Sequence, residues 1–162
     1  MTIPKLEPGQ EWVWDYPRPP RIERSKRLVR IEFAGLEIAR SARTWRVLET
    51  SHPPVFYIPC EDLAVDALRP AAGSSLCEWK GRATYYDLVV GDRVAERAAW
   101  AYLAPYPHYA QLSNSIAFYP ARVDAAYVDD ERVRGQPGDF YGGWITSEII
   151  GPFKGARGTE GW

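Results

Sequence analysis

The stretch ETSHPPVFYIPCED, residues 49–62, combines residue types that carry out acid–base chemistry. It contains one histidine, one cysteine and three carboxylates. Glu49 and His52 resemble an acid–base pair, because histidine titrates near neutral pH and is the commonest general base. His52 directly precedes a diproline, which predicts a turn in which a histidine caps backbone groups or faces solvent. The sequence is compatible with both roles of His52, and the structural role is favoured over the catalytic one.

The stretch CEWKG, residues 77–81, combines a thiol, a carboxylate and an amine. Lys80 would stabilise a nucleophilic thiolate at Cys77 if both side chains shared one face. In a continuous strand they point to opposite faces, so Cys77 is interpreted as a small buried hydrophobe. Glu78 and Lys80 share a face, next to a glycine that lets a backbone or a ligand approach. They either orient a ligand or form a weak surface ion pair.

Metal and cofactor sites have little support in the sequence. The side chains that could ligate a soft metal are His52, Cys60, Cys77 and His108. Their number suits a tetrahedral zinc site, but the Cys-x-x-Cys and His-x-x-x-His spacings typical of such sites are missing. The phosphate-binding patterns G-x-G-x-x-G and G-x-x-x-x-G-K-[ST] are missing as well. We therefore expect no metal and no cofactor.

The charge balance bears on the class of partner. Lys and Arg total 20 and Asp and Glu total 21, which gives a formal net charge of −1. Such a chain has no general attraction to nucleic acid or to an anionic membrane. Basic and aromatic residues do alternate, as in Trp79-Lys80. This pattern suits base stacking, but it suits an aromatic β core equally well, and we favour the core.

The sequence carries no sign of export or of membrane insertion. No apolar run approaches the roughly 18 residues that a membrane span needs. The N-terminal stretch MTIPKLEPGQEW lacks the apolar centre of a signal peptide. With only two cysteines in the chain, we expect a reduced cytoplasmic setting and no disulfide.

The fold class follows from composition and periodicity. Seven Trp, ten Tyr and five Phe accompany fourteen Pro and thirteen Gly, and these types favour strands and turns respectively. Strands are predicted at 28–33, 36–41, 44–50, 55–59, 74–80, 83–90, 93–103, 116–120 and 123–133. Short helical segments are predicted within 60–68 and 108–115. The pattern predicts a single antiparallel, mainly β domain with one or two short helices.

Three segments are expected along this one domain. Residues 1–27 form an extended, proline-rich N-terminal arm, residues 28–135 form the antiparallel β core, and residues 136–162 form a C-terminal wrap rich in Gly, Pro and aromatic residues. The arm contains Trp12 and Trp14, which predicts that it packs on the body of the protein. A chain of 162 residues is long enough to bury a core as one domain.

Several strings together resemble a known protein family. They are WDYPRPP, VLETSHPPVFYIP, CEWKGRATYY, AAWAYLAPYP, FYP and FYGGWITSEIIGPFKG. Through these strings, which span residues 12–155, the chain resembles the bacterial and fungal family known as domain of unknown function 427, which also carries a nucleotidyltransferase-like label. The resemblance implies a β-tent-like architecture, similar to methionine sulfoxide reductase B and the thalidomide-binding domain of cereblon. It implies no established activity.

The resemblance also limits what can be carried over. Relatives of the β-tent architecture hold zinc through two Cys-x-x-Cys pairs, which this sequence lacks, and Cys60 stands where the family typically has proline. The paired carboxylates and Gly-Ser motif of true nucleotidyltransferases are missing too, so the residues do not support that label. Within the shared strings, Glu49 and Lys80 are the polar residues that a packed core does not explain.

Three functions remain open from the sequence, which does not decide whether there is catalysis. The favoured one is a domain that binds a small polar or cyclic ligand in an aromatic-lined cleft. The expected ligand-binding residues are Glu49, Tyr57, Glu78, Lys80, Tyr85 and Trp100. The second is an enzyme of the transferase or hydrolase type in the same cleft, and its candidate catalytic residues are Glu49, His52 and Cys77. The third is a protein-interaction module whose arm and tail dock a partner or a second copy as a homo-oligomer.

Overall fold

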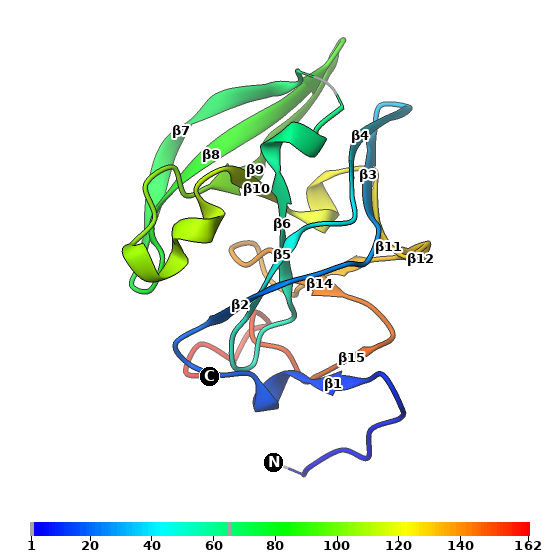
Figure 1. Cartoon of the computed structure of the whole chain (residues 1–162), viewed down its shortest axis with the longest axis vertical. Helices are drawn as coiled ribbons and strands as arrows, with labels where there is room; N and C mark the ends of the chain where they lie inside the picture. Colours follow the sequence, from blue (N-terminus) through cyan, green and yellow to red (C-terminus); the bar gives the residue numbers. More distant parts are fainter. Residues whose placement is uncertain (1, 65) are drawn as a thin grey trace.

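The stretches of alternating residues in the sequence form paired strands in the structure. The computed structural model describes residues 2–64 and 66–162. Antiparallel sheets with short connections make up most of the molecule, as Figure 1 shows. The prediction of a mainly β, antiparallel fold is therefore confirmed.

The larger sheet has the strand order β2-β5-β6-β10-β9-β8-β7, and all neighbouring strands in it are antiparallel. Its strands are β2 (Arg21–Arg24), β5 (Trp45–Leu48), β6 (Val55–Pro59), β7 (Leu68–Cys77), β8 (Gly81–Val90), β9 (Arg93–Ala101) and β10 (Ser115–Phe118). Strand β2 pairs with β5 from Arg21 opposite Leu48 to Arg24 opposite Trp45. The sheet thus includes the last part of residues 1–27.

The smaller sheet begins with the two strands predicted at 28–33 and 36–41, which pair as a hairpin. Its strand order is β12-β11-β3-β4, with β3 (Val29–Phe33), β4 (Leu36–Ser41), β11 (Ala125–Val128) and β12 (Glu131–Arg132). Two residues, Ala34 and Gly35, join β3 to β4 with φ of 52° and 78°. Positive φ at both central residues is the geometry of the tight turn that matches the twist of the flanking strands.

The two faces of the larger sheet carry different side chains. One face joins the smaller sheet in an apolar core whose members include Val29, Ile31, Phe33, Phe56, Ile58, Leu88, Ile116, Phe118 and Trp144. The other face carries mostly aromatic side chains with polar groups, including Tyr57, Tyr85, Trp100, Tyr102, Tyr109 and Tyr119. The period of two along each strand explains this division: Phe56 and Ile58 face the apolar core, and Tyr57 between them faces the opposite way.

The strand predicted over residues 74–80 is confirmed only for residues 74–77. Strand β7 ends at Cys77, residues 78–80 form a turn, and β8 begins at Gly81. The hairpin lies at the edge of the larger sheet. Gly81 adopts φ of +114°, which side chains other than hydrogen rarely allow. The expectation that Cys77 and Lys80 point to opposite faces of one strand therefore does not hold, because the chain reverses direction between them.

Helix is limited, among the described residues, to four short 3-10 segments. They are η1 (Val13–Asp15), η2 (Cys60–Asp62), η3 (Pro107–Leu112) and η4 (Pro120–Arg122). The helical segment predicted within 108–115 is confirmed as η3. The one predicted within 60–68 is confirmed only at η2, and residue 65 lies outside the described residues.

The two ends of the chain lie side by side at one end of the molecule, at the bottom of Figure 1. Strands β1 (Glu11–Trp12) and β15 (Ile149–Ile150) pair in parallel, and β13 (Arg134–Gly135) pairs with β14 (Trp144–Ile145). The ring of Trp14 lies edge-on to Trp162 with centroids 5.2 Å apart. Its Nε1 donates a hydrogen bond of 2.9 Å to the carbonyl of Pro152.

A charged cluster fixes the arm to the larger sheet. Arg46 on β5 donates two hydrogen bonds of 2.9 Å to the carboxylate of Glu11 and a third, of 2.6 Å, to Glu23 on β2. Tyr16 donates a further hydrogen bond of 2.5 Å to Glu11. Bidentate pairs of this kind specify geometry as well as adding stability. The arm of this protein therefore packs on its own sheet.

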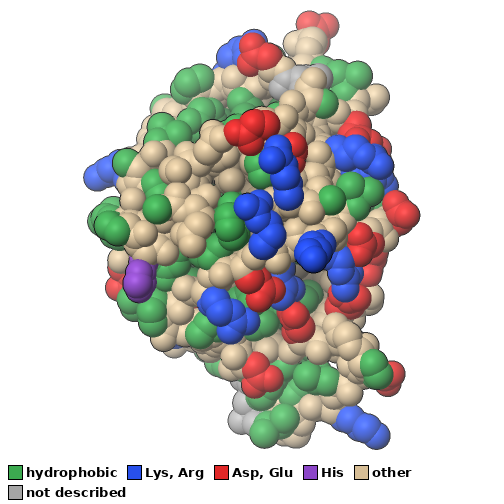
Figure 2. Space-filling model, viewed as in Figure 1, with side chains coloured by type: hydrophobic (Ala, Val, Ile, Leu, Met, Phe, Trp, Pro, Cys, Tyr) green, Lys and Arg blue, Asp and Glu red, His purple; other side chains and the backbone are tan. Residues whose placement is uncertain are grey.

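Charges are mixed on the face seen in Figure 2, where cationic and anionic side chains alternate with hydrophobic ones. This agrees with the balanced composition of 20 basic and 21 acidic residues. Within the described ranges, no helix has the length and apolar character needed to cross a membrane.

Candidate functional site

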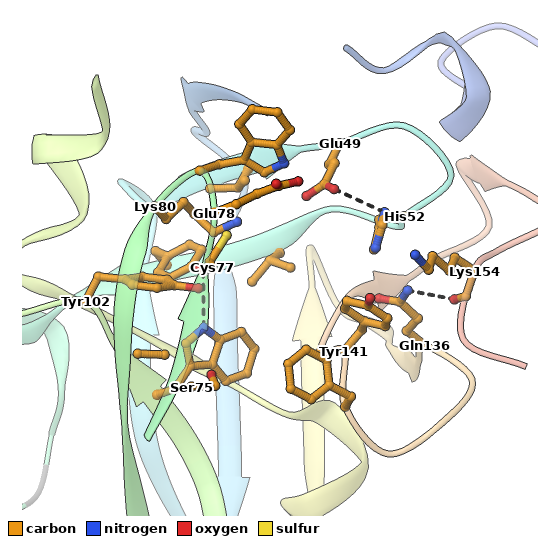
Figure 3. A pocket seen from close by; sticks show the side chains of 18 of the residues that line it. Glu49, His52, Ser75, Cys77, Glu78, Lys80, Tyr102, Gln136, Tyr141 and Lys154 are labelled. Atoms are coloured by element: carbon orange, nitrogen blue, oxygen red, sulfur yellow. Dashed lines mark hydrogen bonds and ion pairs between the residues drawn. The ribbon is translucent and has the colours of Figure 1, made fainter. Parts of the chain in front are cut away.

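The aromatic face of the larger sheet opens into a cavity of about 380 Å³. The cavity lies between the β7–β8 hairpin, the turn after β5 and the C-terminal segment, whose side chains converge on it in Figure 3. This volume lies within the range of small-molecule sites, roughly 300–1,000 Å³. Sheet, turn and C-terminal segment together thus form a concave site of ligand size.

Aromatic rings from neighbouring strands form the floor of the cavity. Trp100 on β9 lies 4.6 Å from Tyr119 between ring centroids and stands nearly perpendicular to Tyr57. Its Nε1 donates a hydrogen bond of 3.2 Å to the Tyr57 hydroxyl. Burial raises the pKa of Tyr57, Tyr102 and Tyr119. These phenols stay neutral at physiological pH and keep a proton to donate.

Tyr85 on β8 belongs to the same wall. Its hydroxyl lies 2.8 Å from the Ser75 hydroxyl on β7. The guanidinium of Arg97 lies 3.9 Å from the centroid of the Tyr85 ring, a distance typical of a cation–π contact. These contacts hold the ring in place, so the wall is preformed.

A tight turn places Glu49 and His52 at the cavity. The amide of His52 donates a hydrogen bond of 3.0 Å to the carbonyl of Glu49. Ser51, the third residue of the turn, has φ of 70°, a position where glycine is usual because side chains are strained there. The Ser51 hydroxyl is buried and has no hydrogen-bond partner among the described residues. A strained turn of this kind is a feature that clusters at functional sites.

The imidazole of His52 is buried and neutral. Its Nδ1 lies 2.9 Å from the carbonyl of Thr50, which can only accept, so Nδ1 carries the proton and Nε2 is free to accept one. Burial lowers the pKa of His52, and the Glu49 carboxylate, whose Oε2 lies 4.0 Å from Nδ1, opposes that shift only in part. The arm adds Arg18, whose Nε lies 3.9 Å from the same Oε2.

The turn between β7 and β8 brings Cys77, Glu78 and Lys80 to the opposite side of the cavity. Lys80 is only 8% exposed. Its carbonyl accepts a hydrogen bond of 2.9 Å from the amide of Tyr106, which fixes the turn. Its Nζ lies 5.8 Å from the ring centroid of Tyr102. Within the part of the chain that the structure describes, the ammonium has neither an ion pair nor a hydrogen bond.

The C-terminal segment covers one side of the cavity with residues that the sequence did not single out as binding residues. Gln136, which is buried, receives a hydrogen bond from the Gly143 amide and donates one of 2.7 Å to the carbonyl of Lys154. The ring of Tyr141 lies edge-on to His52 with centroids 4.8 Å apart. The string FYGGW contained a signal for this segment, since its paired glycines allow a close approach of backbone to a ring.

Gly142 is the residue that allows this approach. A Cβ built at Gly142 would lie 2.7 Å from Cζ3 of Trp100, closer than carbon atoms pack. The C-terminal segment can therefore lie against the aromatic floor only if residue 142 lacks a side chain.

All eight sequence-predicted site residues line this one cavity. They are Glu49, His52, Tyr57, Cys77, Glu78, Lys80, Tyr85 and Trp100. Their binding and catalytic roles stay predictions. The carboxylate-bearing Glu78 is exposed at the rim, whereas Tyr57, Lys80 and Trp100 are buried.

The remaining metal-ligand candidates lie elsewhere. Cys60 lies at the surface at η2, where partial desolvation of its thiol and the neighbouring Glu61 raise its pKa. Neither Cys60 nor His108 lines the cavity with His52 and Cys77. Across residues 2–64 and 66–162, no group of three or more His, Cys, Asp and Glu side chains is arranged to hold a metal ion.

Residues 21–129 match the model of the family described as "Domain of unknown function (DUF427)". The match covers more than half of the chain. This chain belongs to that family. A search of the curated proteins found none that matches it.

The family match extends from β2 to β11. It includes the turn with Glu49 and His52, the aromatic strands and the turn with Lys80. The residues that cover the cavity from the C-terminal side, Gln136 to Trp162, lie beyond the matched region. The site therefore combines a floor that belongs to the DUF427 domain with a cover from the sequence that follows it.

Proposed function

We propose that this protein is a ligand-binding domain that holds a small, flat, polar molecule in the aromatic cavity, with Glu49 and Lys80 as polar anchors. Tyr57, Tyr85 and Trp100 supply rigid, flat surfaces for a ring to stack against. Glu49 accepts hydrogen bonds at one side, and Lys80 donates them from the other.

The observation that carries this proposal is the burial of Lys80 beside an open cavity. The stem of Lys80 is packed into the protein, whereas its Nζ is not one of the described side-chain atoms that are fully buried without a partner. The ammonium is therefore accessible from the cavity, where a bound molecule would replace water as its hydrogen-bond partner. Enclosed aromatic walls and a few converging polar groups are the usual composition of a small-molecule site.

A thermal-shift screen tests the proposal. The panel consists of nucleosides, nucleotides, cyclic imides and small aromatic acids, because each combines a ring with polar groups. A ligand that binds the native state raises Tm by mass action. We expect at least one class to raise Tm of the parent and to lose that effect in Glu49→Gln and Lys80→Met.

Two variants at exposed positions serve as controls, Glu96→Gln and Lys26→Met. They remove the same charges away from the cavity, so both should respond to the ligand as the parent does. If no class raises Tm of the parent, the ligand-binding proposal fails. If the controls lose the response as well, the effect is one of net charge and not of the cavity.

An enzyme of the hydrolase or transferase type is the second candidate, favoured by the neutral imidazole of His52. Its Nε2 can accept a proton, while the Thr50 carbonyl holds Nδ1 at 2.9 Å. Cys77, which lines the same cavity, is its candidate nucleophile. If the ligand found in the screen is turned over, His52→Asn should abolish turnover and preserve binding. If Cys77 does not react with iodoacetamide in the folded protein, a mechanism with Cys77 as the nucleophile is excluded.

A further inference from the structure

We infer that the ligand carries an anionic oxygen group, a carboxylate or a phosphate on a flat ring, and that Lys80 binds this group. The inference rests on the proposed function and adds the charge of the ligand to it. It follows from a comparison of the cations that line the cavity, which are Arg18, Lys80 and Lys154.

Two of the three cations already have partners. Arg18 lies 3.9 Å from the Glu49 carboxylate and donates a hydrogen bond of 3.2 Å to the carbonyl of Thr50. The Nζ of Lys154 donates one of 3.2 Å to the carbonyl oxygen of Trp162. Lys80 differs from both, since its ammonium makes no such contact with the described residues and has only the distant ring of Tyr102.

Lys80 is also the most deeply placed of the three. Lys80 is buried, whereas Arg18 is exposed and Lys154 is half-buried. The interaction of an ammonium with an anion strengthens as water is removed, because the effective dielectric constant falls. An anionic group that reached Lys80 would therefore be bound more tightly than one held at the rim.

The neighbours of Lys80 favour an anion over a neutral acceptor. The hydroxyls of Tyr57 and Tyr102 are neutral, because burial raises the pKa of both. No carboxylate among the described residues lies within 4.0 Å of the ammonium, the distance at which the ion pairs of this structure are found. Glu49 and Glu78 line the same cavity, but neither forms an ion pair with Lys80, so its charge is left for an anionic oxygen of the ligand.

The arrangement of the aromatic walls bears on the shape of the remainder of the ligand. Trp100 and Tyr119 lie 4.6 Å apart at an interplanar angle of 51°, and Tyr57 stands at 86° to Trp100. Flat faces at these angles suit a ring that stacks on one wall and meets another edge-on. The combination points to an aromatic or heteroaromatic acid.

Matched acids and amides test the inference. Benzoate is compared with benzamide, and 2-naphthoate with 2-naphthamide, because each pair differs in charge and hardly in shape. Phenyl phosphate distinguishes phosphate from carboxylate recognition. Dissociation constants are measured by NMR titration for the parent, Lys80→Gln, Lys80→Met and the exposed control Lys26→Met.

We expect the parent to bind at least one acid at least tenfold more tightly than its amide. Both Lys80 variants should lose about 10- to 100-fold in acid affinity, the range for a hydrogen bond to a charged group, while their affinity for the amide changes less than threefold. Lys26→Met should bind as the parent does. If phenyl phosphate surpasses both carboxylates, the anionic group is a phosphate.

A second readout is the stability of the free variants. The ammonium is accessible from the cavity and makes no ion pair or hydrogen bond with the described residues, so Lys80→Met and Lys80→Gln should change Tm by less than about 2 °C without ligand. A loss of more than about 4 °C in both variants would mean that Lys80 is kept for the stability of the fold and not for a ligand. Two variants are used because Lys80→Gln retains polarity if Lys80→Met fails to fold.

Three outcomes would overturn the inference, and they differ in what they say of the proposed function. Equal binding of acid and amide to the parent refutes the anionic ligand and leaves ligand binding in place. Unchanged acid affinity in both Lys80 variants assigns the anion to another residue. If neither the matched pairs nor the wider screen bind, the inference falls together with the proposed function.

Discussion

The two faces of the larger sheet are built from the same strands and have different chemistry. On the face towards the smaller sheet, side chains such as Phe118 and Ile58 pack without polar atoms. On the opposite face, the neighbours of these residues in the sequence are Tyr119 and Tyr57, whose hydroxyls are buried at the cavity. One face belongs to a packed core, and the other lines a cavity of ligand size.

This difference shows what distinguishes a core from a site. A fold gains most from apolar side chains that fill space. Hydroxyl groups add little to packing, and each requires a hydrogen-bond partner when it is buried. The aromatic face of this sheet carries tyrosines and a buried lysine around unfilled volume, which the stability of the fold alone does not explain.

The largest effect on stability is expected when a large side chain is removed from the packed face. Phe118 is 1% exposed, and Phe118→Ala leaves a cavity there, which should reduce the free energy of unfolding by about 3–5 kcal/mol. The matched change on the other face, Tyr102→Phe, removes one hydroxyl and should change it by less than about 1 kcal/mol. Urea unfolding of both variants measures the contrast. Similar losses for the two would mean that both faces are core.

A smaller effect is expected where the C-terminal segment meets the aromatic floor. Gly142→Ala introduces a methyl group that would lie 2.7 Å from Cζ3 of Trp100, and overpacking of this kind lowers stability by roughly 1–3 kcal/mol. Because the segment is displaced from the cavity, ligand affinity should fall as well. Gly161→Ala is the control, since a Cβ there meets open space. A stable Gly142→Ala that binds as the parent would show that the segment is not part of the site.

The smallest effect is expected from acidification of the cavity rim. Burial lowers the pKa of His52 in the folded protein below the ordinary value of 6.5. At a pH between this lowered pKa and 6.5, His52 is protonated in the unfolded chain but not in the folded protein. Stability is therefore complete above pH 6.5 and decreases as the pH falls towards the folded pKa. Thermal melts from pH 7.5 to 5 should show this decrease in the parent.

The same melts separate His52 from other titrating groups. His52→Asn keeps a donor for the Thr50 carbonyl and cannot titrate, so its Tm should depend less on pH in this range. His108→Asn, at an exposed position, should follow the parent. An unchanged pH dependence in His52→Asn would mean that other groups control it.

The sequence predicted the parts of the fold that have local signals. Alternation along the chain predicted the strands at 28–33 and 36–41, which form the first hairpin, and those at 83–90 and 93–103, which form β8 and β9. Strand β7 was missed in part, because Pro70 and Gly73 are typical of turns. In the structure they lie where the register of β7 on β8 shifts, which is where strands tolerate such residues.

The candidate site could be predicted only as a set of residue types. Glu49 and Lys80 were singled out because a packed core does not explain them, and they do line one cavity. Gln136 and Lys154 were not, since their position depends on how the C-terminal segment crosses the sheet. No periodicity encodes such a crossing. It results from pairing between residues far apart in the chain.

The pairing of β1 with β15 has a consequence for the order of folding. Glu11 lies opposite Ile149, so nearly the whole chain must be collapsed before this contact can form, and the entropy of closing so long a loop opposes it until then. The pair is expected to form last and to open first, and its amide protons should exchange with solvent before those of β9. Opening would also release Trp162 from Trp14, and Trp162 lines the cavity. If the chain ends open before the rest of the fold, the cavity loses the side of its wall that Trp162 forms while the sheet beneath it stays intact.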